Sequence, residues 1–348
     1  MSISTAIAEK FSKIVASLQG TINILITQVD PDALASAFMM VELVHRIRGG
    51  DNGVKVFYGG AIGHQQNRAI CNRLGLSDRM HHASKMMKES DFHNLVLLDS
   101  NKAEDGRCLS GRKFDPVIVV DHHRGSDFQD GEGKFILIED IGATSTLMFE
   151  LFEGAGYKFD GVNSIALLLA VGIHTDTNNL VSCTERDVSA YGKLMPYIDH
   201  QELMAVFNYP LLQTDYTCML TALTNVSQKG ASLITNIGAV TSRDGDILST
   251  LADYLIRKDG VSVVIVWGLM LDTKHVRISA RSTDISLDLA AFLREAFGPS
   301  SGGKFMPDGK SIGGGVISID FPYWLTSETI TEALALVKKR IESAVFRQ

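Results

Sequence analysis

Acidic and imidazole side chains follow several apolar segments in the first half of the chain. In chain order they are Asp30, Asp32, Asp99, Asp121, His122, His123 and Asp176. Carboxylates that lie close together repel one another unless cations are placed among them. Oxygen ligands with a few imidazole nitrogens suit Mg²⁺ or Mn²⁺, and the imidazoles favour Mn²⁺. Because a pair of such ions is a common device for hydrolysing phosphoesters, the pattern predicts a hydrolytic metal centre.

Each of these residues taken alone has a plainer interpretation. A single aspartate after a strand usually caps the next helix, and Asp30-Pro31-Asp32 by itself is typical of a capped turn. An isolated pair such as His122 and His123 usually lies on the surface or in the core. The metal centre is favoured because four separate segments each contribute a ligand-type residue.

The segments that must position these residues have the pattern of an α/β fold. Short apolar runs rich in β-branched residues predict buried parallel strands at residues 23–27, 55–58, 94–98, 116–120 and 135–138. Helical apolar spacing appears at residues 33–48, 67–74, 144–154 and 165–173. This alternation predicts an open, mostly parallel sheet with helices on both faces. Ligands of such sheets bind at the carboxyl ends of the strands, so the acidic residues should share one edge.

The second half of the chain predicts a separate, smaller α+β domain. Strands are predicted at residues 231–240, 261–268 and 275–280, and helices at 248–257, 287–297 and 334–346, with a glycine-rich segment at 298–315. Residues 187–213 have a helical pattern without strand runs. The predicted organisation is therefore a catalytic domain at 1–186, a helical connector at 187–213 and a substrate-binding domain at 214–348.

The composition favours an enzyme acting on a small substrate. The chain of 348 residues has a formal net charge of −7, which disfavours binding to duplex DNA because that depends on neutralising many phosphates. The four cysteines are widely spaced, so neither a zinc ribbon nor a disulfide framework is expected. No window approaches the roughly 18 apolar residues of a membrane span. We expect a cytoplasmic protein without a membrane partner.

Several motifs resemble those of the DHH phosphoesterases. Residues 120–124 (VDHHR) resemble the motif that names the family, residues 30–36 (DPDALAS) resemble motif I, Asp99 resembles motif II, and residues 172–177 (GIHTDT) resemble motif IV. Residues 63–68 (GHQQNR) are similar to a segment of the bacterial nano-RNase and adenosine 3′,5′-bisphosphate phosphatase branch. The motifs stand in the family's order, which is more specific than any one of them.

The second half resembles the DHH-associated domain. The residues that carry this likeness, and that the resemblance implies hold the nucleotide, are Arg281, Ser282, Gly302, Gly303, Lys304, Gly314 and Gly315. Glycine loops of this kind let backbone N–H groups approach a phosphate closely.

The resemblance also implies roles for the acidic cluster. Asp30 and Asp99 would bind one metal, and Asp99 would bridge to a second metal held with Asp32, His122 and Asp176. Asp121 would orient a ligand, while His123 and Arg124 would face the substrate phosphate. The cofactor implied is a pair of Mn²⁺ or Mg²⁺ ions. In this family, residues corresponding to 142–146 lie near the active site, although here they are most simply a loop and a helix cap.

Two positions depart from the family pattern. The usual histidine before the first motif I aspartate is missing from residues 26–30 (ITQVD), so the first metal site is predicted to be weak, altered or absent. Gln28 and His64 are the two candidates to replace it, and an amide is a poorer Mn²⁺ ligand than imidazole. Lys304 stands where the family has a histidine after Gly302-Gly303, which predicts a shifted substrate preference.

The predicted function is hydrolysis, by metal-activated water, of a short single-stranded oligoribonucleotide or a small nucleotide such as a dinucleotide or adenosine 3′,5′-bisphosphate. An exonuclease and a phosphatase both fall within this prediction. Two alternatives stay open: a pyrophosphatase or polyphosphatase, and a catalytically weakened nucleotide-binding regulatory protein. A homodimer is also left open. His81 and His82 are expected on a solvated loop or helix face.

Overall fold

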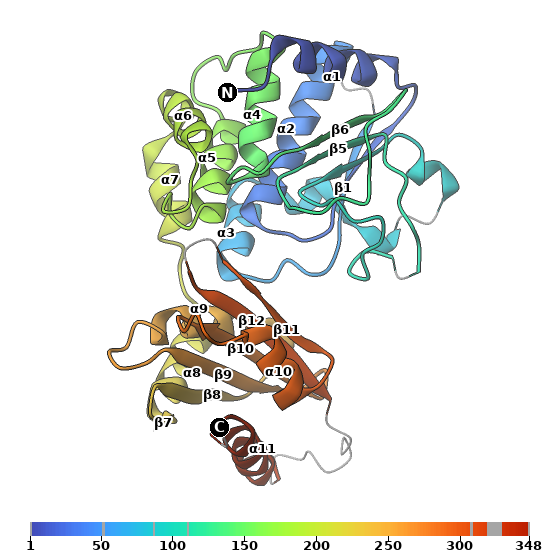
Figure 1. The fold of residues 1–348 in the computed structure, drawn as a ribbon. Helices are drawn as coiled ribbons and strands as arrows, with labels where there is room; N and C mark the ends of the chain where they lie inside the picture. The colour runs from blue at the N-terminus through green and yellow to red at the C-terminus, as the bar shows by residue number, and fades with distance from the viewer. Residues whose placement is uncertain are drawn as a thin grey trace. The chain divides into compact units, whose positions relative to one another are not determined.

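The structure is a computed structural model that describes residues 2–50, 53–85, 88–109, 111–306, 309–318 and 329–346. The chain divides into two compact units, Met1–Tyr209 and Pro210–Gln348 (Figure 1). The segment 187–213, predicted as a connector, contributes two helices to the first of these units.

The first unit is built on a sheet of six parallel strands in the order β3-β2-β1-β4-β5-β6. The strands are β1 (Ile22–Ile26), β2 (Val54–Tyr58), β3 (Met80–His82), β4 (Leu95–Leu98), β5 (Ile118–Asp121) and β6 (Phe135–Ile138). The predicted α/β class with a parallel sheet is confirmed. Because all strands run the same way, the residues that follow them meet at one edge.

Seven α-helices accompany this sheet in the described part of the first unit. They are α1 (Thr5–Ser17), α2 (Pro31–Arg48), α3 (Gln65–Arg73), α4 (Thr144–Gly154), α5 (Ser164–Asp176), α6 (Glu185–Leu194) and α7 (His200–Phe207). Single 3₁₀ turns occur at η1 (Ser77–Arg79), η2 (Ala83–Lys85), η3 (Glu89–Phe92) and η4 (Met195–Tyr197). Helices α1, α2 and α4 pack against one another beside the sheet (Figure 1).

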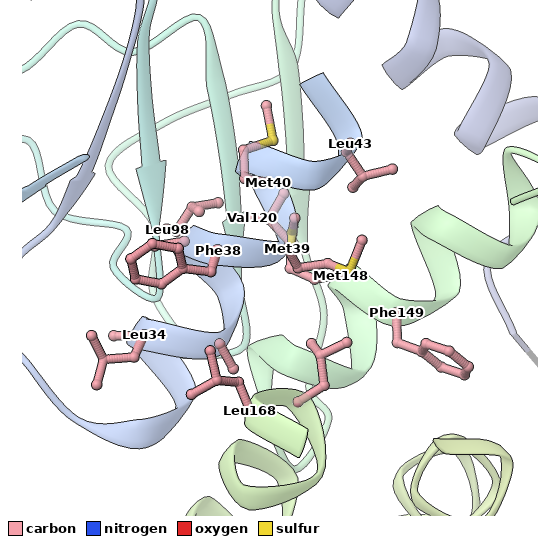
Figure 2. Close-up of a cluster of buried hydrophobic side chains, with 14 of the residues drawn as sticks. Leu34, Phe38, Met39, Met40, Leu43, Leu98, Val120, Met148, Phe149 and Leu168 are labelled. Carbon is pink, nitrogen blue, oxygen red and sulfur yellow. The ribbon is translucent and has the colours of Figure 1, made fainter. Parts of the chain in front are cut away.

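Helix α2 is the centre of the main core. It begins after Asp30, whose carboxylate accepts a hydrogen bond from the Ala33 N–H, and ends at Gly49 in the left-handed conformation. Its side chains Phe38, Met39 and Met40 are buried, and they face residues from β4, β5, α4 and α5 (Figure 2). This packing holds the amino end of α2 against the carboxyl edge of the sheet.

The opposite face of the sheet is covered differently from the prediction. Leu25, Leu97 and Val119 point to that face and pack on Ala83 of η2 and on Phe114, which belongs to the connection between β4 and β5. Among the described residues, short turns and irregular chain therefore pack on this face, where helices were expected. The connection between β4 and β5 is consequently anchored close to the strand ends.

The prediction that His81 and His82 lie on a loop or a helix is wrong, although His81 is exposed as expected. Both residues lie in β3, which pairs with β2 through Phe57 and Tyr58. An edge strand of three residues is too short to show alternation of apolar and polar side chains, and its pairing is made by the backbone.

The second unit contains a mixed six-stranded sheet in the order β11-β12-β10-β9-β8-β7. Its strands are β7 (Ser227–Lys229), β8 (Ser232–Val240), β9 (Val263–Met270), β10 (His275–Ser282), β11 (Ser301–Phe305) and β12 (Ser311–Ser318). Its helices are α8 (Gln213–Thr224), α9 (Ile247–Leu255), α10 (Leu289–Phe297) and α11 (Ile330–Val345), with a 3₁₀ turn at η5 (Ser242–Asp244). One core cluster joins the sheet to α8 and α9 and another joins it to α10 and α11, so the predicted smaller α+β domain is confirmed.

The predicted glycine loops of the second unit are strands. Gly302 and Gly303 lie in β11 and pair with Gly314 and Gly313 of β12. A Cβ on Gly303 would lie 2.7 Å from the carbonyl oxygen of Ile312. The glycines therefore allow the paired strands to approach closely. Residue type alone does not distinguish this role from the role of glycines in a phosphate-binding loop.

Within the described residues, no helix is long and apolar enough to cross a membrane.

Candidate metal centre

Asp32 connects the amino ends of two helices. It is almost completely buried, and its two carboxylate oxygens accept hydrogen bonds from the N–H groups of Thr144 and Ser145, each at 2.7 Å. These N–H groups begin α4, whose N-cap residue Ala143 has no side-chain oxygen to offer. Residues 142–146 therefore lie at the carboxyl edge of the sheet, next to the predicted ligands.

Asp99 follows β4 in a strained backbone conformation. Its φ angle is 53°, a value that non-glycine residues adopt rarely and that often marks a functional site. The hydroxyl of Thr144 donates to Asp99 Oδ1 at 3.0 Å. Asp99 and Asp32 are thus held by adjacent groups at the start of the same helix.

His122 presents a buried ring nitrogen to three carboxylates. Its Nδ1 lies 3.1 Å from the carbonyl oxygen of Ile141, and since a carbonyl only accepts, Nδ1 carries the proton. Nε2 is buried and lies 3.0 Å from Asp176 Oδ2 and 3.6 Å from Asp99 Oδ1.

These atoms fit a divalent cation. Ligand atoms of Asp32, His122 and Asp176 lie within 4.8 Å of one another, as do those of Asp99, His122 and His123. Carboxylate oxygens with an imidazole nitrogen are a donor set for Mn²⁺. The hydrogen bond of His122 to Ile141 is the kind that fixes a metal-ligating imidazole.

Asp121 orients His123 rather than His122. The carboxylate of Asp121 is fully buried, and its Oδ1 accepts from His123 Nδ1 at 2.8 Å. Asn101 holds the same residue by donating to the carbonyl oxygen of His123 at 2.6 Å. The imidazole of His123 is about half exposed, at 49%, so its Nε2 is left to contact a ligand.

Three carboxylates of the cluster have raised pKa values in the metal-free protein. Burial, together with the negative charge of Asp176, raises the pKa of Asp30 to about 6 and that of Asp32 to about 7. Burial also raises the pKa of Asp99, to which Asp30 and Asp32 add repulsion. Burial lowers the pKa of His122, but Asp176 and Asp32 outweigh it and raise the value to about 9. The cluster therefore retains protons when no cation compensates its negative charge.

Comparison with known proteins relates the first unit to a family. Residues 21–173 match the DHH family, N-terminal domain. We call the first unit, which holds this match, the DHH domain. Its described residues place Asp32, Asp99, His122 and Asp176 together at the carboxyl edge of the sheet.

Among the proteins that the chain resembles are two curated relatives. An uncharacterized protein of Methanocaldococcus jannaschii is 29% identical over 274 residues, which cover 77% of this chain and 53% of that protein. A probable manganese-dependent inorganic pyrophosphatase of Staphylococcus aureus is 24% identical over 229 residues, covering 64% of this chain and 66% of that protein. The chain thus spans between half and two thirds of the length of these relatives.

The crystal structure of an exopolyphosphatase-related protein from Bacteroides fragilis has a TM-score of 0.69 to this chain. The two sequences are 17% identical, and the match covers 98% of this chain and 97% of the other. At this identity the likeness shows a shared fold.

The Asp30 side of the DHH domain differs from the His122 side. Gln28, one candidate for the missing motif I histidine, accepts a hydrogen bond from Arg107 through its Oε1. His64, the other candidate, uses Nδ1 to accept from the Gln66 N–H at the start of α3. Neither Asp30 nor His64 belongs to the two groups of potential ligands found among the described residues.

Arg124 lies outside the contacts that join the cluster. Its side chain is 83% exposed and donates to Asp140 Oδ2 at 2.6 Å. The exposed Asp140 is thus its partner in this conformation. A role on substrate would require Arg124 to leave that ion pair.

Asp187 supports the DHH domain in a way that the sequence did not reveal. This fully buried carboxylate accepts from the Gly142 N–H at 3.0 Å and from the Thr146 hydroxyl at 2.6 Å. It also forms a capping box with Thr184 at the start of α6. The Thr-x-x-Asp spacing signals the cap, but only the fold brings the cap to residues 142–146.

In the second unit, Arg281 and Ser282 are buried. Arg281 donates to both oxygens of Asp253, at 2.5 and 3.0 Å, and to the carbonyl oxygen of Ala280 at 2.9 Å. The Ser282 hydroxyl accepts from the Asp284 N–H at 3.0 Å. Both candidates thus make structural contacts here.

The remaining candidates of the second unit lie on two paired strands. Gly302, Gly303 and Lys304 belong to the edge strand β11, where Gly303 and Lys304 are exposed. In β12, Gly314 pairs with Gly302, and Gly315 pairs with Ser301.

Proposed function

We propose that this chain is a phosphoric ester hydrolase that depends on a divalent cation and acts on a small nucleotide. The observation that carries the proposal is the buried cluster in which Nε2 of His122 lies among the carboxylates of Asp32, Asp99 and Asp176. Carboxylates crowded together in a buried site repel one another unless a cation lies among them, so the cluster points to a bound divalent cation. The DHH domain and the pyrophosphatase relative support a hydrolase.

Manganese is the cation that the donor set favours. Three carboxylates with one imidazole suit Mn²⁺, and the Staphylococcus aureus relative is named as manganese-dependent. When bound, such a cation lowers the pKa of a water molecule and neutralises charge on the phosphate.

Within this chain, His123 is the residue placed to move a proton. Its Nδ1–H is held by the buried Asp121, and its side chain is half exposed. In the reaction, water attacks phosphorus and gives up a proton to the solvent, the ester bond to the leaving oxygen breaks, and His123 Nε2–H protonates that oxygen. His123 then regains a proton from the solvent. Asp121 stabilises the imidazolium before this transfer, as a carboxylate does for a catalytic histidine.

The substrate class follows from the second unit and from charge. We propose a short oligoribonucleotide, a dinucleotide or adenosine 3′,5′-bisphosphate, because the second unit resembles the DHH-associated domain through Arg281, Ser282 and the glycines of β11 and β12. Lys304 is exposed on β11 and offers a positive charge to a phosphate. The net charge of −7 favours a short ligand over a long polyanion.

A second candidate function is inorganic pyrophosphate hydrolysis. The relative from Staphylococcus aureus is named as a probable manganese-dependent inorganic pyrophosphatase. Hydrolysis of pyrophosphate would require the same cluster of carboxylates and imidazoles, but it would not require a surface that binds a nucleotide base.

A substrate panel with added Mn²⁺ tests both candidates. The panel holds a 5′-phosphorylated diribonucleotide, a longer oligoribonucleotide, cyclic dinucleotides, adenosine 3′,5′-bisphosphate and pyrophosphate. We expect a nucleotide to be turned over, and Asp99→Asn to reduce its turnover by about 10³-fold or more because a metal ligand is lost. Asp115→Asn removes an exposed carboxylate that precedes β5, at the other edge of the sheet, and should leave turnover unchanged.

The outcomes separate the candidates. Turnover of pyrophosphate alone would favour the second function. Tight nucleotide binding without turnover of any compound would contradict both and identify a nucleotide-binding regulatory protein.

A further inference from the structure

The side chain of Arg107 lies where the first strand of the DHH domain ends. Arg107 belongs to the connection between β4 and β5, and its Nη1 donates to Oε1 of Gln28. Its Nη2 lies 3.4 Å from the hydroxyl of Thr27. Gln28 and Thr27 follow β1 and lead directly into Asp30. A guanidinium group therefore occupies the side of the cluster that lacks the motif I histidine.

Asp105 fixes the orientation of this guanidinium. Arg107 Nε lies 3.0 Å from Asp105 Oδ1, and Nη2 lies 2.7 Å from Oδ2, which is the bidentate geometry of a strong ion pair. The side chain of Asp105 is only 13% exposed, and it also accepts from the Arg107 N–H at 2.8 Å. The ion pair is thus local, preorganised and partly shielded from water.

The backbone at Arg107 is held by the neighbouring strand end. The N–H of Gly60, just after β2, donates to the Arg107 carbonyl oxygen at 2.8 Å. A Cβ on Gly59 would lie 2.4 Å from Cys108 Sγ and 2.7 Å from the carbonyl oxygen of Thr27. Because these segments pack closely, the fold itself fixes the position of the Arg107 backbone.

A cation would meet two obstacles on this side. The Gln28 oxygen that would have to bind it already accepts a hydrogen bond from Arg107. A guanidinium stays protonated at all relevant pH values, so it would also repel a dication at this position. On the other side, His122 Nε2 lies among the carboxylates of Asp32, Asp99 and Asp176, where a cation would replace the proton they share.

We infer that the DHH domain binds one divalent cation, and that Arg107 supplies the second positive charge and binds a phosphoryl oxygen of the substrate. This inference rests on the proposed function and names the group that contacts the substrate phosphate opposite the cation. Contacts with the described residues use four of the five N–H groups of Arg107, leaving one on Nη1. The side chain is 47% exposed, so that group can reach a ligand.

The metal count tests the first part of the inference. We expect the purified chain, saturated with Mn²⁺ and then freed of excess, to hold one ion by elemental analysis and by isothermal titration. The double change Gln28→His with Arg107→Ala restores an imidazole and removes the guanidinium, so it should raise the count to two. Two ions in the unaltered protein would overturn the inference.

Phosphate binding tests the second part. Inorganic phosphate is titrated into the Mn²⁺-loaded protein, and Arg107→Ala should weaken its affinity by about tenfold or more because a charge-assisted hydrogen bond is lost. Arg107→Lys keeps the positive charge but lacks the planar guanidinium group. Its phosphate affinity should therefore lie between those of Arg107→Ala and the unaltered protein. Lys113→Ala removes an exposed positive charge from the same connection and should change nothing.

The two tests distinguish failure of the inference from failure of the proposed function. Equal phosphate affinity in Arg107→Ala and the unaltered protein would overturn the role of Arg107, whatever the turnover. One bound ion and Arg107-dependent phosphate binding, without turnover of any compound in the panel, would leave the inference standing and refute the hydrolase. Arg107→Lys also guards against misfolding, since it preserves a cation beside Asp105.

Discussion

At the scale of single residues, the two adjacent histidines have different partners and therefore different roles. His122 donates through Nδ1 to a backbone carbonyl and directs a buried Nε2 at the carboxylates. His123 donates through Nδ1 to the buried Asp121 and remains half exposed. The first arrangement suits a metal ligand and the second a proton donor.

Alanine substitutions should separate these roles. We expect His122→Ala to lower Mn²⁺ affinity by about 100-fold, because it removes the imidazole of the donor set. We expect His123→Ala to change that affinity by only a few fold but to lower turnover by about 10²–10⁴, the usual contribution of a general acid. Isothermal titration and steady-state kinetics measure the two effects, and equal losses of affinity in both variants would contradict the assignment.

The pH dependence of stability should report the crowded carboxylates. The pKa of Asp32 is raised from 3.8 to about 7 and that of Asp30 to about 6, so the metal-free folded state binds protons more tightly than the unfolded state. This stabilisation is complete below pH 3.8 and is lost as the pH rises through 6 to 7. His122, raised from 6.5 to about 9, acts in the same direction at higher pH.

We therefore expect the chelator-treated protein to melt at lower temperature at pH 8 than at pH 6. The increase in Tm on adding Mn²⁺ should grow over the same interval, because the ligands bind the cation when deprotonated. Thermal melts with and without Mn²⁺ measure both trends. Asp32→Asn should flatten the metal-free trend, and an unchanged slope in that variant would refute the explanation.

At the scale of elements, helix α5 approaches α2 closely enough that one glycine is required between them. A Cβ on Gly172 would lie 2.4 Å from Ser145 Oγ and 3.2 Å from Asp32 Oδ1. Gly172 thus allows α5 to pack close to α2, so that Asp176 of α5 can share a metal ion with Asp32 of α2. The same close approach keeps Asp32 on the N–H groups of α4.

Gly172→Ala should displace Asp32 and weaken the metal site. We expect about a tenfold loss of Mn²⁺ affinity together with a loss of stability of about 1–3 kcal/mol from overpacking. Gly192→Ala is the matched control, since a Cβ on this helical glycine of α6 would meet nothing within 4 Å. It should be neutral or stabilise by up to about 1 kcal/mol, and unaltered Mn²⁺ affinity in Gly172→Ala would contradict the packing argument.

At the scale of the whole molecule, each unit has its own hydrophobic core. The described side chains of the first unit form one large cluster and a smaller one, and those of the second unit form two others. The candidate metal ligands all belong to the first unit. Metal binding and the stability of the second unit should therefore respond to different substitutions.

Arg281→Ala tests this separation. Its guanidinium is buried against Asp253, so we expect the loss of the ion pair to destabilise the second unit by about 1–3 kcal/mol. Mn²⁺ affinity should stay unchanged. Limited proteolysis measures the stability of the second unit, and isothermal titration measures Mn²⁺ affinity. A loss of Mn²⁺ affinity without any change in proteolysis would contradict the independence of the two units.

The sequence by itself determined the parallel sheet, the smaller α+β unit and the gathering of acidic residues at strand ends. Apolar runs such as residues 94–98 are local signals, and parallel strands necessarily bring their carboxyl ends to one edge. The strands β3 and β11 escaped prediction because backbone pairing with a neighbour makes them, and short or glycine-rich segments have no periodic pattern.

Only the tertiary structure decided which partner each polar group takes. Asp32 caps α4 from 112 residues away, Arg107 reaches Gln28 across 79 residues, and Asp187 holds Thr146 across 41. Residue type says that a carboxylate or guanidinium will be satisfied, but it does not say by which group. That choice is made when packed helices and strands bring distant chain segments within hydrogen-bond distance.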